Sequence, residues 1–114
     1  MRYRTLTKNK EFSRIYARGK SYVHPNLVLY VAKNRLGYTR IGLTATKKVG
    51  HAVQRNRLRR QLREIYRLHE TSFARGYDLV VVARSRAIGA DYAALEHAYL
   101  SLAARLGLLT QNTP

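Results

Sequence analysis

The chain has 114 residues, of which 46% are apolar, and it carries a formal charge of +16 from 22 Lys and Arg against six Asp and Glu. This apolar share excludes a disordered basic tail and suits a single domain. The absence of cysteine excludes disulfides, thiolate zinc sites and a cysteine nucleophile. Because so large an excess of positive charge opposes compaction, we favour a polyanionic partner over a generically basic protein.

The first predicted helix covers residues 7–18. Thr7 suits its N-cap and Gly19 is placed to end it. The helical period puts three larger apolar side chains on one side, namely Phe12, Ile15 and Tyr16. Residues 20–26 then read as loop or as entry into a strand.

Two strands are predicted next, over residues 27–32 and 40–46, joined by a hairpin connection at 34–39. The first strand alternates between two apolar faces. The second strand has one apolar face and one face of small or polar residues: Gly42, Thr44 and Thr46. That small face is either solvated or the floor of a groove that a ligand approaches closely, and alternation alone favours the solvated reading.

A strongly basic helix is predicted from about residue 53 or 54 to about residue 68. It overlaps the basic segment 47–67, which holds many cations and only one acid, Glu64. An apolar stripe with helical spacing faces inward, formed by Leu58, Leu62, Ile65 and His69. The opposite half and its flank carry Arg55, Arg57, Arg59, Arg60, Arg63 and Arg67. Arginines one turn apart repel each other, so this helix makes physical sense when phosphates lie against it.

The run at residues 79–83 is continuously apolar and predicts a strand covered on both faces. A last helix is predicted at 91–106, ended by Gly107, and residues 108–114 are predicted to form a flexible tail. The order of elements indicates an α+β sandwich of one domain, residues 1–107. The basic helix links two strands that we expect to be parallel neighbours, and the general rule makes such a crossover right-handed.

The residue inventory favours binding over protein-borne catalysis. The six acids are scattered and form no paired carboxylates, and the four histidines lack ligand spacing. The segment 47–50 leads into the basic helix and could bring a phosphate to its N-terminus, although one glycine is weak support. Aromatic residues beside a basic surface are typical of single-strand binding. For Phe12 the pattern favours a core position instead, and for Tyr16 and Tyr30 both readings stay open.

The run KKVGHAVQRNRLRRQLRE at residues 47–64 resembles the signature of the bacterial ribonuclease P protein subunit. The resemblance extends to Glu11-Phe12 with Tyr16, to LVLYV at 27–31, to IGLTATKK at 41–48 and to DLVVVAR at 78–84. It implies a two-layer α+β fold like domain 2 of ribosomal protein S5, with a small, mostly antiparallel sheet. It also implies a left-handed βαβ crossover around the basic helix, against the general rule.

The resemblance further implies two sets of binding residues. The set expected to contact the catalytic RNA is Lys47, Lys48, Arg55, Asn56, Arg57, Arg59, Arg60, Arg63 and Arg67. The set expected to line a cleft for the single-stranded leader is Phe12, Tyr16, Tyr30, Thr44, Thr46 and Ala83. This reverses the core reading of Phe12 and the solvated reading of the small strand face. His51 replaces an asparagine common in the family, so its role is left open.

The implied function is that of the protein subunit of ribonuclease P. Such a subunit binds the catalytic RNA and the 5′ leader of precursor tRNA and so promotes endonucleolytic removal of the leader, which creates mature tRNA 5′ ends. The resemblance assigns the Mg²⁺-dependent chemistry to the RNA, so we expect no catalytic residue, metal site or cofactor in the protein. The alternatives are a non-catalytic RNA-binding protein of ribosome or ribonucleoprotein assembly, and a self-sufficient nuclease, which the scattered acids disfavour.

Overall fold

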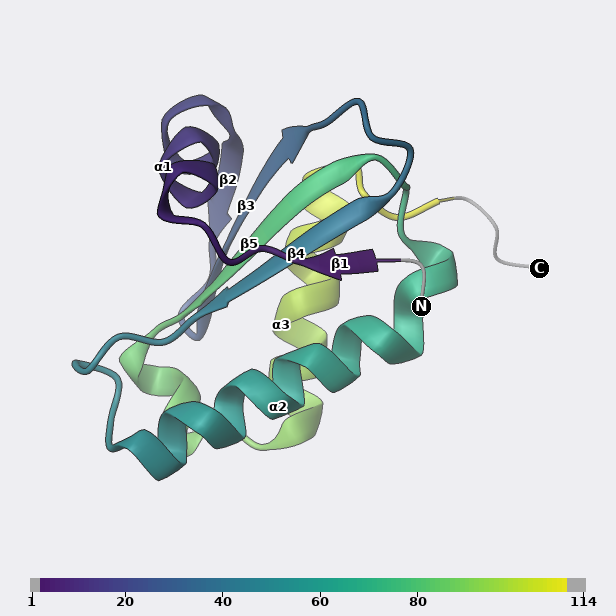
Figure 1. Cartoon of the computed structure of the whole chain (residues 1–114). Coiled ribbons are helices and arrows are strands. Elements are labelled where there is room, and N and C mark those ends of the chain that lie inside the picture. Colours follow the sequence, from purple (N-terminus) through teal and green to yellow (C-terminus); the bar gives the residue numbers. More distant parts are fainter. Residues whose placement is uncertain (1–2, 111–114) are drawn as a thin grey trace.

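The computed structural model describes residues 3–110 and consists of one five-stranded sheet with helices on both faces (Figure 1). The strands are β1 (Tyr3–Thr5), β2 (Lys20–Val23), β3 (Leu27–Lys33), β4 (Thr39–Thr44) and β5 (Tyr77–Ala83). The helices are α1 (Asn9–Arg18), α2 (Ala52–His69) and α3 (Tyr92–Arg105), with short 3₁₀ turns η1 (Glu70–Ser72) and η2 (Ser85–Gly89). The predicted α+β class is confirmed.

The sheet order is β1-β4-β5-β3-β2. The strand β5 runs parallel to β4 and antiparallel to β3, with which it forms the longest ladder, and the outer pairs are β1 parallel to β4 and β2 antiparallel to β3. The main core lies between the sheet and the helices α2 and α3, and a smaller core lies under α1 on the other face. The two cores meet at β5, whose side chains alternate between them. Leu79 and Val81 are buried in the main core, and Val80 is buried in the smaller core under α1.

The expected hairpin at residues 34–39 is wrong. Strands β3 and β4 are not neighbours, because β5 lies between them and pairs with both. A continuously apolar strand needs cover on both faces and a partner on each edge, so β5 takes the centre of the sheet. The segment after β3 therefore crosses the end of β5 instead of turning back on its own strand.

The basic helix α2 forms where the pattern places it, and it connects the parallel neighbours β4 and β5 as expected. Its buried residues are Leu58, Leu62, Ile65 and Tyr66. His69, predicted on the inward stripe, is only half-buried and lies 2.8 Å from a carboxylate oxygen of Glu96 on α3. The left-handed sense of this crossover stays a prediction.

Two boundaries differ from the sequence pattern. Helix α1 begins at Asn9 with Lys8 as N-cap, so Thr7 does not cap it, although Gly19 follows its last residue as predicted. At the other end, Leu108 is buried in the main core, and the backbone oxygen of Leu108 accepts a 2.7 Å hydrogen bond from the Ala74 amide. The domain thus continues to Thr110, and the remainder of the predicted tail, residues 111–114, lies outside the described residues.

Candidate nucleic-acid interface

The outer face of α2 presents a row of exposed arginines. Arg57, Arg60 and Arg63 point away from the core, and within residues 3–110 they have no side-chain hydrogen bond or ion pair. Two of them line a shallow groove along the helix, which is formed by Val53, Asn56, Arg59, Arg60 and Arg63. Guanidinium groups with free donors can make multidentate bonds to phosphate oxygens. We call this surface the arginine face.

Two other arginines of the predicted set instead hold the loop that leads into α2. The Arg55 side chain donates a 2.8 Å hydrogen bond to the backbone oxygen of Gly50. Arg59 donates to the backbone oxygen of Ala45 at 3.2 Å and to the side chain of Asn56 at 3.1 Å. Both guanidinium groups therefore brace the β4–α2 loop while keeping further donors for a ligand.

The braced loop projects two lysines beside the helix. Lys47 and Lys48 are exposed, whereas the next residue, Val49, is buried and anchors the loop in the core. The helix then starts with His51 as N-cap, whose backbone amide donates to the Gln54 side chain at 2.8 Å. This gives His51 a position at the helix start, where its ring is exposed.

One predicted arginine is already paired. Arg67 donates to Glu64, three residues earlier on α2, at 3.0 Å, and this exposed pair raises the pKa of Arg67 and lowers that of Glu64. An exposed pair of this kind contributes little to stability. Arg67 therefore offers less free charge than Arg57, Arg60 or Arg63.

The second surface lies on the α1 side of the sheet and is aromatic. The ring of Tyr16 on α1 meets the ring of Tyr30 on β3 edge to face, with 4.8 Å between centroids, and the Phe12 ring lies 6.4 Å from that of Tyr16. Tyr16 is 41% exposed, and Phe12 and Tyr30 are partly buried. Phe12 thus both packs against the small core and borders the open surface. We call Phe12, Tyr16, Tyr30 and Thr44 the aromatic face.

Gly42 explains how close α1 comes to this face of the sheet. A Cβ atom at position 42 would lie 2.6 Å from the Phe12 ring. The Phe12 ring therefore occupies the space above Gly42, so this part of β4 is not the floor of an empty groove. Thr44, two residues further on, is partly exposed on the same face.

Ala83 does not belong to the aromatic face. It is 4% exposed and packs in the main core, on the α2 and α3 side of the sheet. Side chains alternate along a strand, and the register pairs Thr44 with Val82, so Val82 is the β5 residue beside the aromatic face. The alternation along β5 would have identified Val82 from the sequence. Thr46 is exposed but lies beyond the end of β4, in the loop.

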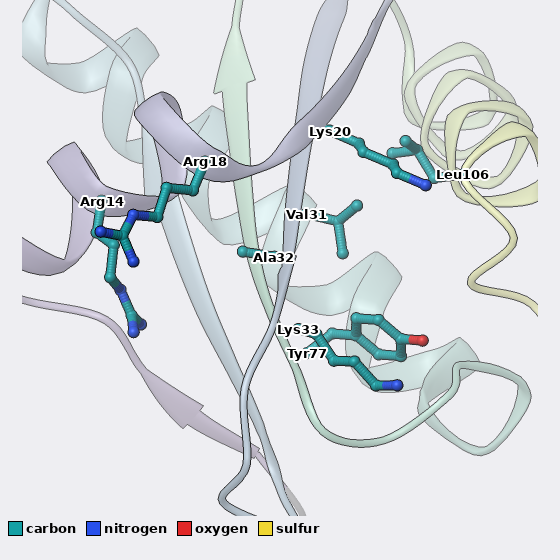
Figure 2. A pocket seen from close by; sticks show the side chains of 8 residues that line it. All are labelled: Arg14, Arg18, Lys20, Val31, Ala32, Lys33, Tyr77 and Leu106. Atoms are coloured by element: carbon teal, nitrogen blue, oxygen red, sulfur yellow. The ribbon is translucent and has the colours of Figure 1, made fainter.

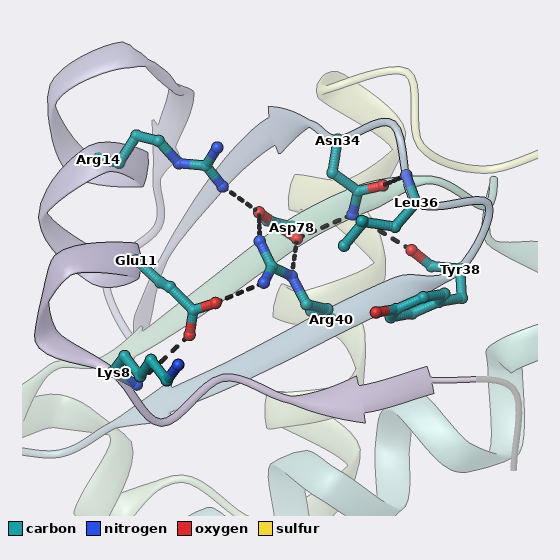
Figure 3. A network of polar contacts seen from close by, with 8 residues as sticks. All are labelled: Lys8, Glu11, Arg14, Asn34, Leu36, Tyr38, Arg40 and Asp78. Carbon is teal, nitrogen blue, oxygen red and sulfur yellow. Dashed lines mark hydrogen bonds and ion pairs between the residues drawn. The ribbon is translucent and has the colours of Figure 1, made fainter.

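A buried polar network fixes α1 to the sheet (Figure 3). The Asp78 side chain is fully buried on β5, and its carboxylate accepts hydrogen bonds from Arg14 at 2.8 Å, from Asn34 at 2.8 Å and from Arg40 at 2.8 and 2.7 Å. Arg40 also pairs with Glu11 on α1. Sequence reasoning missed this network, although Asp78 and Arg40 share the strand face that α1 covers.

The network favours the ionised forms of both Asp78 and Arg40. Burial raises the pKa of Asp78, but the hydrogen bonds from Arg40 and Asn34 and the charges of Arg40 and Arg14 outweigh it and hold the pKa below its ordinary value. The same hydrogen bond raises the pKa of Arg40, against a smaller opposing effect of burial. Asp78 is therefore a carboxylate that orients α1, and through α1 the aromatic face.

Two further acids have partners on α2 and α3. Asp91 caps α3 by accepting a 2.8 Å hydrogen bond from the Ala94 amide, and Glu96 contacts His69. Within residues 3–110 no three His, Cys, Asp or Glu side chains gather as a metal site would require. What the arrangement offers is a row of free cations on one side of the sheet and partly exposed aromatic rings on the other, two features that suit RNA binding.

The comparisons with known proteins agree with this chemistry. The sequence profile of the Ribonuclease P family matches residues 1–107. The chain belongs to the ribonuclease P protein family. It is 44% identical over 109 residues to a ribonuclease P protein component of Clostridium botulinum (strain 657 / Type Ba4), an alignment that covers 95% of this chain and 98% of the relative.

Solved ribonuclease P proteins share the fold. The structure is similar to that of the Staphylococcus aureus RNase P protein, with a TM-score of 0.87, 27% identity and coverage of 93% of this chain and 97% of that one. It is also similar to the RNase P protein from Thermotoga maritima, with a TM-score of 0.78, 30% identity and coverage of 85% and 92%.

Membership of the family makes the chain a subunit of ribonuclease P, the holoenzyme that acts on tRNA precursors. This holoenzyme is RNA-based and generally needs Mg²⁺, and the family implies partnership with the catalytic RNA and with precursor tRNA. Among the described residues, no helix is both long and apolar enough to cross a membrane.

Proposed function

We propose that this ribonuclease P subunit binds two RNAs through two different surfaces and leaves bond cleavage to the catalytic RNA. The arginine face of α2, with Lys47 and Lys48, contacts the catalytic RNA. The aromatic face holds the single-stranded 5′ leader of precursor tRNA. The observation that carries the proposal is the T-shaped pair of Tyr16 and Tyr30, half-exposed on the sheet face opposite α2.

The arginine face suits a folded RNA. Its side chains belong to one rigid helix whose apolar stripe is locked in the main core, so the spacing of the charges is fixed before binding. A preformed array of guanidinium groups loses little conformational entropy when it meets a phosphate backbone. Such an array reads the shape of an RNA backbone rather than its sequence.

The aromatic face suits a single strand. Unpaired bases expose both faces of their rings, and a tyrosine ring offers a stacking surface that tolerates any base. The Asp78 network holds α1 in place, so Phe12 and Tyr16 keep a defined position relative to Tyr30. A paired, mature tRNA 5′ end has no such strand to offer.

The test compares Tyr30→Ala with Tyr22→Ala in the reconstituted holoenzyme. Tyr22 is an exposed tyrosine on the edge strand β2, outside the aromatic face, so it serves as the matched control. We expect Tyr30→Ala to weaken binding of leader-bearing precursor tRNA by about 1–3 kcal/mol and to leave binding of mature tRNA unchanged. Equal losses for the two tRNAs, or an equal effect of Tyr22→Ala, would contradict the assignment.

A further inference from the structure

A second groove adjoins the arginine face, between α2 and the start of α3. It is shallow, has a volume of about 350 Å³ and has a mostly apolar surface. The residues that line it are Arg57, Arg60, Gln61 and Glu64 from α2 and Tyr92 from α3. The α2 residues are three or four positions apart, so they form one stripe along the helix. Arg60 also lines the groove described above, so this second groove, which we call the Tyr92 groove, continues the arginine face.

Tyr92 presents its ring to this groove. The residue is partly exposed, whereas its hydroxyl oxygen is buried and has no hydrogen-bond partner among residues 3–110. The accessible part of the side chain is therefore the ring, in agreement with the apolar surface of the groove. A tyrosine ring is a surface on which an unpaired base can stack.

The ring has a fixed position beside α2. Tyr92 is the first residue of α3 and follows the N-cap Asp91, whose side chain accepts a 2.8 Å hydrogen bond from the Ala94 amide. One turn later, Leu95 is fully buried in the main core, to which α2 also contributes. A ring held in this way loses little conformational freedom when a base stacks on it.

The charge beside the ring is positive. Glu64 lines the groove, but its carboxylate accepts a 3.0 Å hydrogen bond from Arg67 and is balanced by it. Arg57 and Arg60 are exposed and have no ion pair in the part of the chain that the structure describes, residues 3–110. A ring next to two free guanidinium groups can hold both parts of a nucleotide, because the base stacks and the phosphate accepts charge-assisted hydrogen bonds.

Tyr77, at the start of β5, is a useful contrast. It also packs against the main core with part of its side chain exposed. Figure 2 shows Lys33 beside it, whereas Arg14 and Arg18 extend from α1 on the other side of β3. Tyr77 thus matches Tyr92 in residue type and partial burial but does not have two arginines beside it.

We propose that the Tyr92 groove is a nucleotide site for the catalytic RNA, in which an unpaired base stacks on Tyr92 while the adjoining phosphates lie against Arg57 and Arg60. The inference rests on the proposed function, because it takes the arginine face as the surface that meets the catalytic RNA. It adds one contact with a base to that surface. Arginines alone hold an RNA backbone, whereas stacking requires a base outside a helix. The groove therefore selects an RNA that has an unpaired nucleotide at this point.

The test removes the ring and keeps the packing. Tyr92→Leu and Tyr92→Met both fill the core side of the position without an aromatic surface. Tyr92→Phe keeps the ring and removes only the buried hydroxyl, and Tyr77→Leu is the matched control elsewhere on the main core. Thermal melts identify the temperature range in which all four variants are folded, and binding is measured within that range.

We expect Tyr92→Leu and Tyr92→Met to bind ribonuclease P RNA at least about fivefold more weakly than wild type, which is the lower end of what stacking on an aromatic side chain contributes. Tyr92→Phe and Tyr77→Leu should bind as wild type does. A stacked base releases no counterion, so the slope of log affinity against log salt should keep its wild-type value in every variant. A substitution that acted by displacing the arginines of α2 would change this slope.

Three results would overturn the proposal: wild-type affinity of both ring-free variants for ribonuclease P RNA, an equal loss in Tyr77→Leu, or a loss confined to binding of precursor tRNA by the holoenzyme. A failure of the proposed function gives a different result. If the double variant Arg57→Gln and Arg60→Gln keeps both the affinity and the salt slope of wild type, the arginine face is not the surface for the catalytic RNA. If the double variant loses affinity and the ring-free variants do not, only the stacking site is rejected.

Discussion

At the scale of single residues, Asp78 is the side chain on which the aromatic face most depends. Its buried carboxylate accepts hydrogen bonds from Arg14, Asn34 and Arg40. Asp78→Asn leaves the Arg40 guanidinium, 17% exposed, without its main partner. We expect a loss of unfolding free energy of about 3–5 kcal/mol, measured by urea denaturation. The control Glu64→Gln removes an exposed pair and should lower the unfolding free energy far less; equal losses would contradict the assigned role.

The same carboxylate makes the stability depend on pH. The pKa of Asp78 is lowered in the folded protein, so its contribution is complete above the unfolded value of about 3.9 and is lost as pH falls toward the folded pKa. The difference in unfolding free energy between wild type and Asp78→Asn should therefore shrink below about pH 4. Denaturation curves measured between pH 3 and pH 7 test this, and a difference that stays constant over that range would contradict it.

Gly42 gives a steric prediction at the same scale. A methyl group there would meet the Phe12 ring at 2.6 Å, so Gly42→Ala must push Phe12 and α1 outward. We expect a loss of about 1–3 kcal/mol in unfolding free energy. Gly89→Ala is the matched control, since a Cβ at position 89 meets nothing within 4 Å. If the two substitutions lower the unfolding free energy equally, the close contact between Phe12 and Gly42 is contradicted.

At the scale of elements, α2 is a two-sided helix whose outer charges work together. Replacing Arg57, Arg60 and Arg63 by Gln should weaken binding to the catalytic RNA and reduce the slope of log affinity against log salt by about 2 to 3, since each phosphate contact contributes about 0.7 to 0.9. A control variant with Lys10→Gln, Arg35→Gln and Arg75→Gln removes three exposed cations outside α2 and should change the slope less. Affinity measured at several salt concentrations checks this, and an unchanged slope would remove α2 from the RNA interface.

The sequence predicts elements better than it predicts their neighbours. The period of α2 and the alternation in β3 identify both elements, because each buries one regular face. The pairing of β4 with β5 rather than with β3 depends on which strand needs two covered faces, a property of the whole sheet. The family resemblance places Ala83 in the cleft, whereas the alternation along β5 turns its side chain to the opposite face of the sheet. Arg55 and Arg59 show a further limit, since their bonds to the loop require its folded path.

At the scale of the whole molecule, the chain separates its tasks on different surfaces of one small sheet. The main core locks α2, so that its arginines face outward, while the Asp78 network locks α1 on the opposite face beside Tyr30. The six acids leave a formal charge of +16, and under the proposed function the phosphate groups of the RNA partners balance this excess positive charge. Under the proposed function, positioning of this kind lets the protein promote a reaction carried out by the catalytic RNA.

We propose that the chain binds and positions RNA and does not itself cut it. The most direct measurement is cleavage of precursor tRNA at low Mg²⁺ by bacterial ribonuclease P RNA alone, by the purified protein alone and by the two together. We predict no cleavage by the protein alone and a clear gain for the combination over the RNA alone. Cleavage by the protein alone that survives purification, or no gain in the combination, would contradict the account.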